Sequence, residues 1–367
     1  MKIAVYHNLE KGGAFNYLVQ ICKELSKEHK IDIYCHKKLV KKNKNIQEIL
    51  FPLSKPKNLI EYLYQVFFEL KSANKKISHD INSKKYDLVI IGQCLLTQTP
   101  YLVKYLNQEL QTIYIFNEPK REFYEQTSYD HYYPKRTIAR MLRIPVKLID
   151  KINCSKAKTI VSNSIYSSFC LKKHYKKKSY VIYPGMKRTP TKQIIKVNNK
   201  MAMSIGAISY IKGHQFSTEQ IRNSKAKLHI LGRHTPESQK TLLISQRSGV
   251  ELIIIKEESD SKKQKIMKNY SIYLANQIKE PFGIATLEAA NQKMIILGTN
   301  EGGTPEVISP GINGFLYPRK ERLAKALFLE IYKRHKIIVY RHNIINWKNT
   351  SDNFLILYHR LKNTPNE

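Results

Sequence analysis

Cysteine is scarce in this sequence, and its placement excludes two common uses. The 367 residues include five cysteines and no CxxC spacing. An odd, scattered set predicts neither a disulfide framework nor a structural zinc site. Free thiols in a reducing compartment are the simplest interpretation. The five positions are Cys22, Cys35, Cys94, Cys154 and Cys170.

Long apolar runs and a secretory signal are also missing. The N-terminal residues "MKIAVYHNLEKGG" lead directly into a strand-like run. No apolar stretch reaches the roughly 20 residues that a membrane-spanning helix needs. We therefore expect a cytoplasmic protein, with a peripheral position at the inner face of the cell membrane as an option.

Acidic residues are few relative to basic ones. Lys and Arg number 63 against 29 Asp and Glu, a net charge of +34. Such an excess predicts an anionic partner: nucleic acid, a membrane face or a phosphorylated substrate. Lysine-rich runs such as "KKNKNI" at 41–46 fit a compositional bias equally well. No zinc-finger, RNP or helix-turn-helix signature accompanies the charge, so we expect no specific nucleic-acid partner.

Strand-like and helix-like segments alternate along the whole chain. The apolar runs are near-continuous and rich in β-branched residues, which is typical of parallel strands covered by helices on both faces. We expect helices over 13–29 and around 57–74, and a longer segment over 135–156. The expected strands lie at 2–7, 31–36, 46–53, 86–92, 112–118, 158–164, 179–185, 201–208, 227–232, 250–257, 271–276, 294–299 and 313–318.

A polar stretch without periodicity, "KRTPTKQIIKVNNK" at 187–200, interrupts this alternation and marks a boundary. The sequence thus predicts an α/β protein of two doubly wound units, 1–188 and 189–345. A final helix-like segment at 346–367 follows, in which Trp347 would mark the return to the first unit. Two such units place the carboxyl ends of two sheets around one cleft, where such sheets bind ligands.

Two acids flank a tight turn in "IKEPFGIATLEAANQKMIILGTNEGGTPEVI" at 278–308. Glu280 lies beyond an expected strand, and Pro281 and Gly283 prevent a helix from running through both acids. A helix can begin near Ile284, with Glu288 in its early turns. Its N-terminal amides and dipole predict an anion site for a phosphate or diphosphate.

Seven blocks of the sequence, two of them within this stretch, resemble the retaining glycosyltransferases of family four, which have the GT-B fold of two facing Rossmann-like domains. The glutamate motif with its following glycines is the most specific of them, and the blocks keep the family's order along the chain. They are "KGGAFNYL" (11–18), "VSNSIYSS" (161–168), "VIYPG" (181–185), "SIGAISYIKGHQ" (204–215), "EPFGIATLEA" (280–289), "GGTPEVI" (302–308) and "NGFLYP" (313–318).

The resemblance implies a donor site for a nucleotide sugar linked to UDP or GDP. Glu280 would contact the donor sugar, and Glu288 would hold the ribose. Lys212 would neutralise the departing diphosphate, because fixed cations stabilise charge that develops on a leaving group. Gly206 opens the same motif and belongs to the donor-binding set. The amides after "PFG" would bind the diphosphate, which assigns Gly283, Ile284 and Ala285.

No "DxD" metal triplet is found in a suitable place, so we expect no metal and no cofactor apart from the co-substrate. Many members of the family carry an arginine where this chain has Ala207. One cation for the diphosphate is then missing, and Arg233, Lys279 or Arg121 are candidates to replace it.

The resemblance assigns acceptor-side residues to the first unit. Gly12 and Gly13 open its first helix and would let the backbone approach the diphosphate; a plain turn between strand and helix is the alternative. The chain reads "NEPKR" where many relatives read "HEPxR", which places Asn117 at the histidine position. Asparagine can hydrogen-bond a sugar hydroxyl but cannot take up a proton near neutral pH. Glu118 and Arg121 are further candidates for polar contacts.

The acceptor is predicted only as a class. Aromatic and basic residues at 58–76 resemble surfaces by which relatives that act on lipid-linked acceptors dock to membranes. We therefore expect transfer of a hexose to a glycan or a lipid-linked acceptor, in cell-surface glycan, polysaccharide or glycolipid assembly. The alternatives are another GT-B sugar-nucleotide enzyme, such as an epimerase or a phosphorylase, and a basic nucleic-acid-binding protein.

Overall fold

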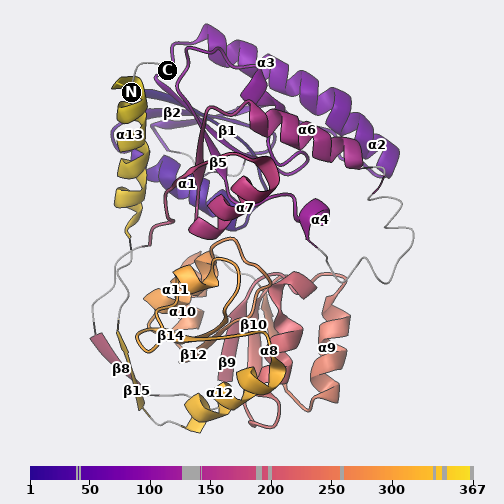
Figure 1. Cartoon of the computed structure of the whole chain (residues 1–367), viewed down its shortest axis with the longest axis vertical. Coiled ribbons are helices and arrows are strands. Elements are labelled where there is room, and N and C mark those ends of the chain that lie inside the picture. Colours follow the sequence, from indigo (N-terminus) through magenta and orange to yellow (C-terminus); the bar gives the residue numbers. More distant parts are fainter. Residues whose placement is uncertain are drawn as a thin grey trace. The chain divides into compact units, whose positions relative to one another are not determined.

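The computed structural model in Figure 1 divides the chain into two compact units. Unit 1 comprises Met1–Gly185 and Ile345–Glu367, and unit 2 comprises Met186–Ile344. The domain division predicted above, at 188 and 345, stays a prediction, and 187–191 lie outside the described residues. The structure describes residues 1–38, 40, 43–125, 141, 143–186, 192–196, 201–256, 260–333, 336–340 and 345–363.

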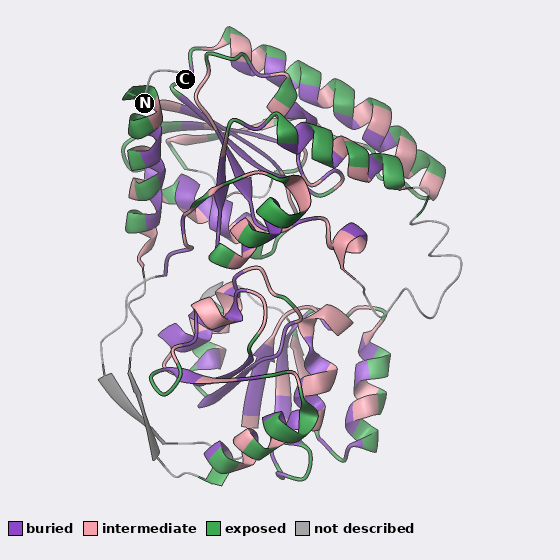
Figure 2. Ribbon diagram, in the orientation of Figure 1, coloured by how far each residue is buried: buried purple, intermediate pink, exposed green. Residues whose placement is uncertain are grey.

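Unit 1 is built on a seven-stranded sheet in the order β3-β2-β1-β4-β5-β6-β7, and all neighbouring strands are parallel. The order reverses between β1 and β4, which is where doubly wound sheets bind ligands. Both strands are almost wholly buried, and Figure 2 shows buried residues along the middle of this sheet. The strands are β1 Lys2–Asn8, β2 Lys30–Cys35, β3 Ile46–Leu50, β4 Leu88–Cys94, β5 Thr112–Phe116, β6 Thr159–Ser162 and β7 Tyr180–Val181.

The helix expected around 57–74 continues to residue 83 as three consecutive segments. α2 (Leu59–Tyr64) leads into the π-helical turn η1 (Gln65–Glu69) and then α3 (Leu70–Ser83). Ile77 and Ile81 are fully buried and extend the apolar face beyond the predicted end. Much of the predicted segment 135–156 precedes α6 (Ile144–Ser155) and lies outside the described residues. The other helical segments are α1 Gly13–Leu25, η2 Tyr101–Lys104, α4 Arg121–Tyr124 and α7 Ile165–Tyr175.

The C-terminal helix α13 (Trp347–Asn363) packs on α1 within unit 1. The ring centroids of Tyr17 and Trp347 lie 6.3 Å apart, and the Thr350 hydroxyl donates to the Tyr183 carbonyl at 2.9 Å. Phe354 is fully buried against the same tyrosine. The last helix therefore completes the core of the unit that the chain builds first.

Unit 2 contains a six-stranded parallel sheet in the order β11-β10-β9-β12-β13-β14, whose order reverses between β9 and β12. A separate antiparallel pair joins β8 (Lys192–Lys196) to β15 (Lys336–Tyr340). The sheet strands are β9 Met201–Ile205, β10 Lys227–Gly232, β11 Leu252–Lys256, β12 Ile272–Ala275, β13 Ile295–Thr299 and β14 Gly314–Tyr317.

Helices cover the sheet of unit 2; α9 and α12 carry exposed residues on their outward faces, whereas every residue of α8 and α11 is buried or intermediate (Figure 2). They are α8 His214–Ile221, α9 Ser238–Arg247, α10 Asp260–Met267, α11 Ile284–Asn291 and α12 Glu321–Lys333, with short turns η4 Tyr210–Lys212 and η5 Thr304–Glu306. Two parallel α/β units are the architecture that the alternating pattern predicted, and this prediction is confirmed. No helix among the described residues has the length and apolar character to cross a membrane.

Candidate donor site in unit 2

The two residues with the strongest predicted roles meet at the point where the strand order of unit 2 reverses. Lys212 follows β9, and Glu280 follows the neighbouring strand β12. The Lys212 ammonium contacts both carboxylate oxygens of Glu280, Oε2 at 2.9 Å and Oε1 at 3.1 Å. Side chains 68 residues apart in sequence thus form one ion pair.

The backbone around this ion pair is closely packed. The Ile278 amide donates to the Ile211 carbonyl at 2.8 Å, which ties the loop after β12 to the turn before Lys212. The aliphatic chain of Lys212 lies against Gly206, where an added Cβ would come within 3.2 Å of the lysine Cδ. Gly206 therefore leaves room for the lysine stem, and the ammonium is directed toward Glu280.

The glycine pair Gly302–Gly303 explains the "GGTPE" block. The Gly303 amide donates to the Glu280 carbonyl at 2.7 Å. Gly302 has φ +66°, and a Cβ there would lie 2.6 Å from the same carbonyl oxygen. Because only glycine allows this approach, the block holds the backbone of Glu280 in place.

Helix α11 begins at Ile284, as the sequence predicts. Gly283 precedes it with φ +92° in the left-handed region. The first-turn amides of a helix have no intrahelical acceptor, and within the described residues the amides of Gly283, Ile284 and Ala285 donate to no protein group. With the helix dipole, these amides form a local site for an anion next to Glu280.

Glu288 carries a feature that the sequence did not predict. Its Oε1 accepts from the Lys263 ammonium of α10 at 2.6 Å. The two side chains are only 12% and 13% exposed. Sequence reasoning missed Lys263, because α10 is a polar helix with three lysines and no periodic signal that singles one of them out.

Arg319 is a second residue that the sequence analysis missed. Its guanidinium donates to the carbonyl oxygens of Asn276 and Gln277, at 2.9 and 3.2 Å, and pairs with Glu301. The arginine follows the "NGFLYP" block, about forty residues from the loop that it holds. It supports the carboxyl end of β12, from which Glu280 emerges.

Within unit 2, the candidates for the missing cation do not join this cluster. Arg233 and Lys279 are exposed, and no described carboxylate pairs with either. Arg121 belongs to unit 1 and pairs with Glu125 at 2.7 Å. At Ala207 itself, the backbone carbonyl lies 3.3 Å from Nε2 of His214. Burial lowers the pKa of this histidine to about 4. That histidine is therefore neutral near pH 7 and adds no charge.

The acceptor-side residues lie in unit 1. Asn117 follows β5; its side-chain amide donates to Gln93 of β4 at 3.2 Å, and its buried Oδ1 has no partner within the described part of the chain. The Glu118 carbonyl accepts from Gln93 and Gln98, and the Glu118 carboxylate lies 4.0 Å from Arg121. The "NEP" segment is thus held at the carboxyl edge of the sheet.

Gly12, directly before α1, lies in open space. A Cβ at Gly12 would have a single neighbour, 4.0 Å away, so the packing of unit 1 does not itself require glycine there. Gly13 is the first residue of α1. His7, at the end of β1, is buried, and burial lowers its pKa to about 4, so it too is neutral near pH 7.

Acidic and sulfur ligands do not gather into a metal cluster in the parts of the chain that are described. The five cysteines are all buried free thiols.

Comparison with known proteins adds a family to this geometry. Residues 186–345 match the model of the family described as glycosyl transferases group 1. The match spans unit 2 with Lys212, Glu280 and Glu288, and for this part of the chain it confirms the predicted resemblance. No curated protein sequence is similar enough to count as a match.

Solved structures share the fold over nearly the whole chain. Sucrose-phosphate synthase from Thermosynechococcus elongatus superposes with a TM-score of 0.76 at 15% identity, covering 98% of this chain and 99% of that one. HepE from Anabaena, solved with UDP and glucose, superposes with a TM-score of 0.65 at 14% identity, covering 99% of this chain and 100% of that one. WaaG, a glycosyltransferase involved in lipopolysaccharide biosynthesis, superposes with a TM-score of 0.62 at 15% identity, covering 100% of this chain and 96% of that one. At such identities the likeness shows the GT-B fold alone.

Proposed function

We propose that this chain transfers a hexose from a UDP- or GDP-linked sugar to a hydroxyl acceptor with retention of configuration. The match of residues 186–345 to the group 1 glycosyltransferase model supports this proposal. The observation that carries the proposal is the Lys212–Glu280 pair beside the N-terminus of α11. HepE, which shares the fold, was solved with UDP and with UDP-glucose, which supports a nucleotide-sugar donor.

Each residue of the site then has a chemical task. The first-turn amides of α11 and the Lys212 ammonium bind the diphosphate and stabilise the charge that grows on it as the bond from the sugar C1 to the phosphate oxygen breaks. Glu280 accepts hydrogen bonds from sugar hydroxyls, and Glu288 from the ribose. The acceptor hydroxyl forms its bond to C1 on the same face and gives its proton to the departing phosphate oxygen. Lys212 and the helix dipole take the place of a divalent metal.

Donor binding is the first consequence to test. A ligand at one hundred times its dissociation constant stabilises a protein by about 2.7 kcal/mol. We expect UDP or GDP, and the corresponding sugar nucleotide, to raise the melting temperature in a thermal-shift screen without added metal. Adenine nucleotides serve as the control. If no nucleotide raises the melting temperature at millimolar concentration, the donor-site proposal is wrong.

Release of the nucleoside diphosphate separates transfer from the alternatives. A transferase releases it when an acceptor is present, and an epimerase converts the sugar nucleotide without an acceptor. The rival nucleic-acid role predicts binding that survives physiological salt, whereas binding by charge alone disappears as salt rises.

On the acceptor side, the surface of unit 1 supports a peripheral position on an anionic membrane. Helices α2–η1 and α6 pack against each other through Val66 and Val146. Each exposes large apolar side chains four residues apart, on one stripe of the helix, with exposed fractions from 48% to 80%. Soluble surfaces seldom gather so many exposed apolar residues on neighbouring helices. They are Ile60, Tyr64 and Phe68 on α2–η1, and Ile144, Leu148 and Ile152 on α6.

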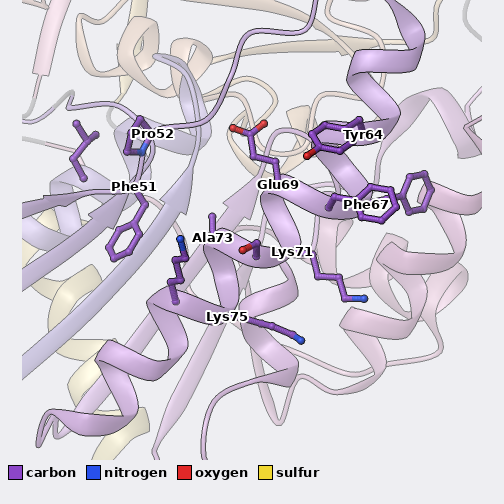
Figure 3. A pocket seen from close by; sticks show the side chains of 12 residues that line it. Phe51, Pro52, Tyr64, Phe67, Glu69, Lys71, Ala73 and Lys75 are labelled. Atoms are coloured by element: carbon purple, nitrogen blue, oxygen red, sulfur yellow. The ribbon is translucent and has the colours of Figure 1, made fainter.

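Lysines and an open pocket border the first of these stripes. The pocket has a volume of about 760 Å³, with Phe51 on one side and Tyr64 and Phe67 on the other (Figure 3). Lys71 and Lys75 extend from α3 along the same pocket, and no carboxylate among the described residues pairs with either. Each lysine near an anionic leaflet contributes roughly 1 kcal/mol to binding. We therefore propose that this face lies on the leaflet, where a lipid-linked acceptor would be presented.

Removing the apolar stripe should release the protein from vesicles. We expect the double variant Tyr64→Ser/Phe68→Ser to bind vesicles containing phosphatidylserine roughly tenfold more weakly than the wild type, because two large apolar side chains no longer enter the interface. Sedimentation with vesicles measures this effect. The matched control replaces two exposed apolar residues of unit 2, Ile312→Ser/Leu323→Ser, and should bind normally. Equal binding by all three proteins would contradict the docking face.

A further inference from the structure

The Lys263–Glu288 ion pair differs from the surface ion pairs of this protein. A pair such as Lys348–Asp352 has side chains that are 70% and 40% exposed, so water screens it, and such pairs contribute little. Lys263 and Glu288 are 13% and 12% exposed, with 2.6 Å between Nζ and Oε1. Taking two charges out of water is costly, and a buried ion pair is weak evidence of a purely structural purpose.

A second contact already connects the two helices. The side-chain amide of Gln292, the residue directly after α11, donates to the side chain of Gln264 in α10. This neutral hydrogen bond lies one turn along α11 from Glu288 and is one residue from Lys263 in α10. It can fix the packing of α10 on α11 without a buried charge, so the ion pair is not needed for that purpose alone.

The position of Glu288 suggests what the charge does. Side chains on a helix lean toward its N-terminus. Glu288 lies five residues after Gly283, so its carboxylate is directed toward the end of α11 that offers free amides to an anion. An ionised carboxylate accepts hydrogen bonds from hydroxyls at both of its oxygens, and an ammonium 2.6 Å from one oxygen fixes the orientation of the group.

We infer that Lys263 is a positioning residue of the donor site: its ammonium orients the Glu288 carboxylate so that it accepts the ribose hydroxyls of the nucleotide. The inference rests on the proposed function. Lys263 acts through Glu288 and need not touch the donor. Its removal should therefore cost affinity only for ligands that carry the ribose hydroxyls.

The test compares UDP with 2′,3′-dideoxy-UDP, or the guanine pair if the thermal-shift screen selects GDP. We expect Lys263→Met to bind UDP about tenfold more weakly in calorimetry, and to bind the dideoxy analogue within about twofold of the wild type. Lys265→Met, an exposed lysine of the same helix, is the matched control and should keep the ribose preference. The double variant Lys263→Met/Glu288→Gln should bind UDP no more weakly than Glu288→Gln alone.

Several outcomes would overturn the inference. In Lys263→Met, these are equal losses of affinity for UDP and for its dideoxy analogue, or an unchanged preference for the ribose hydroxyls. Additive losses of affinity in the double variant, or a wild type that binds both nucleotides equally well, would also contradict it. If Lys263→Met does not fold, Lys263→Arg should retain the preference and Lys263→Gln should lose it; a full preference in Lys263→Gln contradicts the inference. A wild type that binds neither UDP nor GDP would refute the proposed function itself. This result differs from every outcome that contradicts only the role of Lys263.

Discussion

Replacing Lys212 with methionine should lower kcat by about 100- to 1,000-fold, the range seen when an enzyme loses one fixed donor to a developing negative charge. Lys212 is the one cation among the described residues that contacts Glu280. The charge on the leaving diphosphate increases as the glycosidic bond breaks, so the ammonium stabilises the transition state more than the bound donor. We therefore expect KM for the sugar nucleotide to change much less than kcat in steady-state assays.

Two control variants sharpen this experiment. Lys268→Met removes an exposed lysine from the same unit and should leave kcat unchanged. Lys212→Arg keeps the charge but must fit a bulkier group beside Gly206, so it should recover only part of the rate. The melting temperature of each variant shows whether the fold is intact. A Lys212→Met enzyme with normal kcat and a normal melting temperature would refute the role of Lys212.

The strands could be predicted well because of their position in the fold. β4, β12 and β13 are buried along their whole length, so each appears in the sequence as a continuous apolar run. The helix over 59–83 was predicted too short, because its last two turns carry polar residues between Ile77 and Ile81. Its π-helical turn at 65–69 has no local sequence signal that we can identify.

From residue spacing alone, only the part of the candidate site that lies in one stretch of chain could be predicted, and Lys212 was indicated by the family resemblance instead. Glu280, Gly283 and Glu288 lie within nine residues of sequence, and their spacing around a turn is visible without a fold. Lys263 and Arg319 were not predicted, because their partners belong to other elements and come near only when the sheet assembles. Which of the lysines in α10 faces α11 depends on helix packing, which the polar sequence "DSKKQKIM" does not encode in its periodicity.

Glu280→Gln should lower kcat and, at the same time, tighten the binding of the nucleoside diphosphate product. In the structure the Lys212 ammonium contacts both oxygens of the Glu280 carboxylate. The carboxylate therefore competes with a diphosphate for contact with this ammonium. Glutamine keeps the shape of the side chain and removes its charge. The ammonium is then left without its counter-charge and attracts a nucleoside diphosphate more strongly.

We therefore expect calorimetry to give about three- to tenfold tighter binding of UDP or GDP to Glu280→Gln, while kcat falls about 100-fold because the contact with the donor sugar is weakened. Glu301→Gln is the matched control: it removes one negative charge that pairs with Arg319 in the same unit, and should not tighten binding. The difference should shrink as salt rises, because ions screen charges that are partly exposed to solvent. If Glu280→Gln binds the diphosphate more weakly than the wild type, Glu280 does not compete with the diphosphate for Lys212, and the carboxylate instead helps to build the anion site.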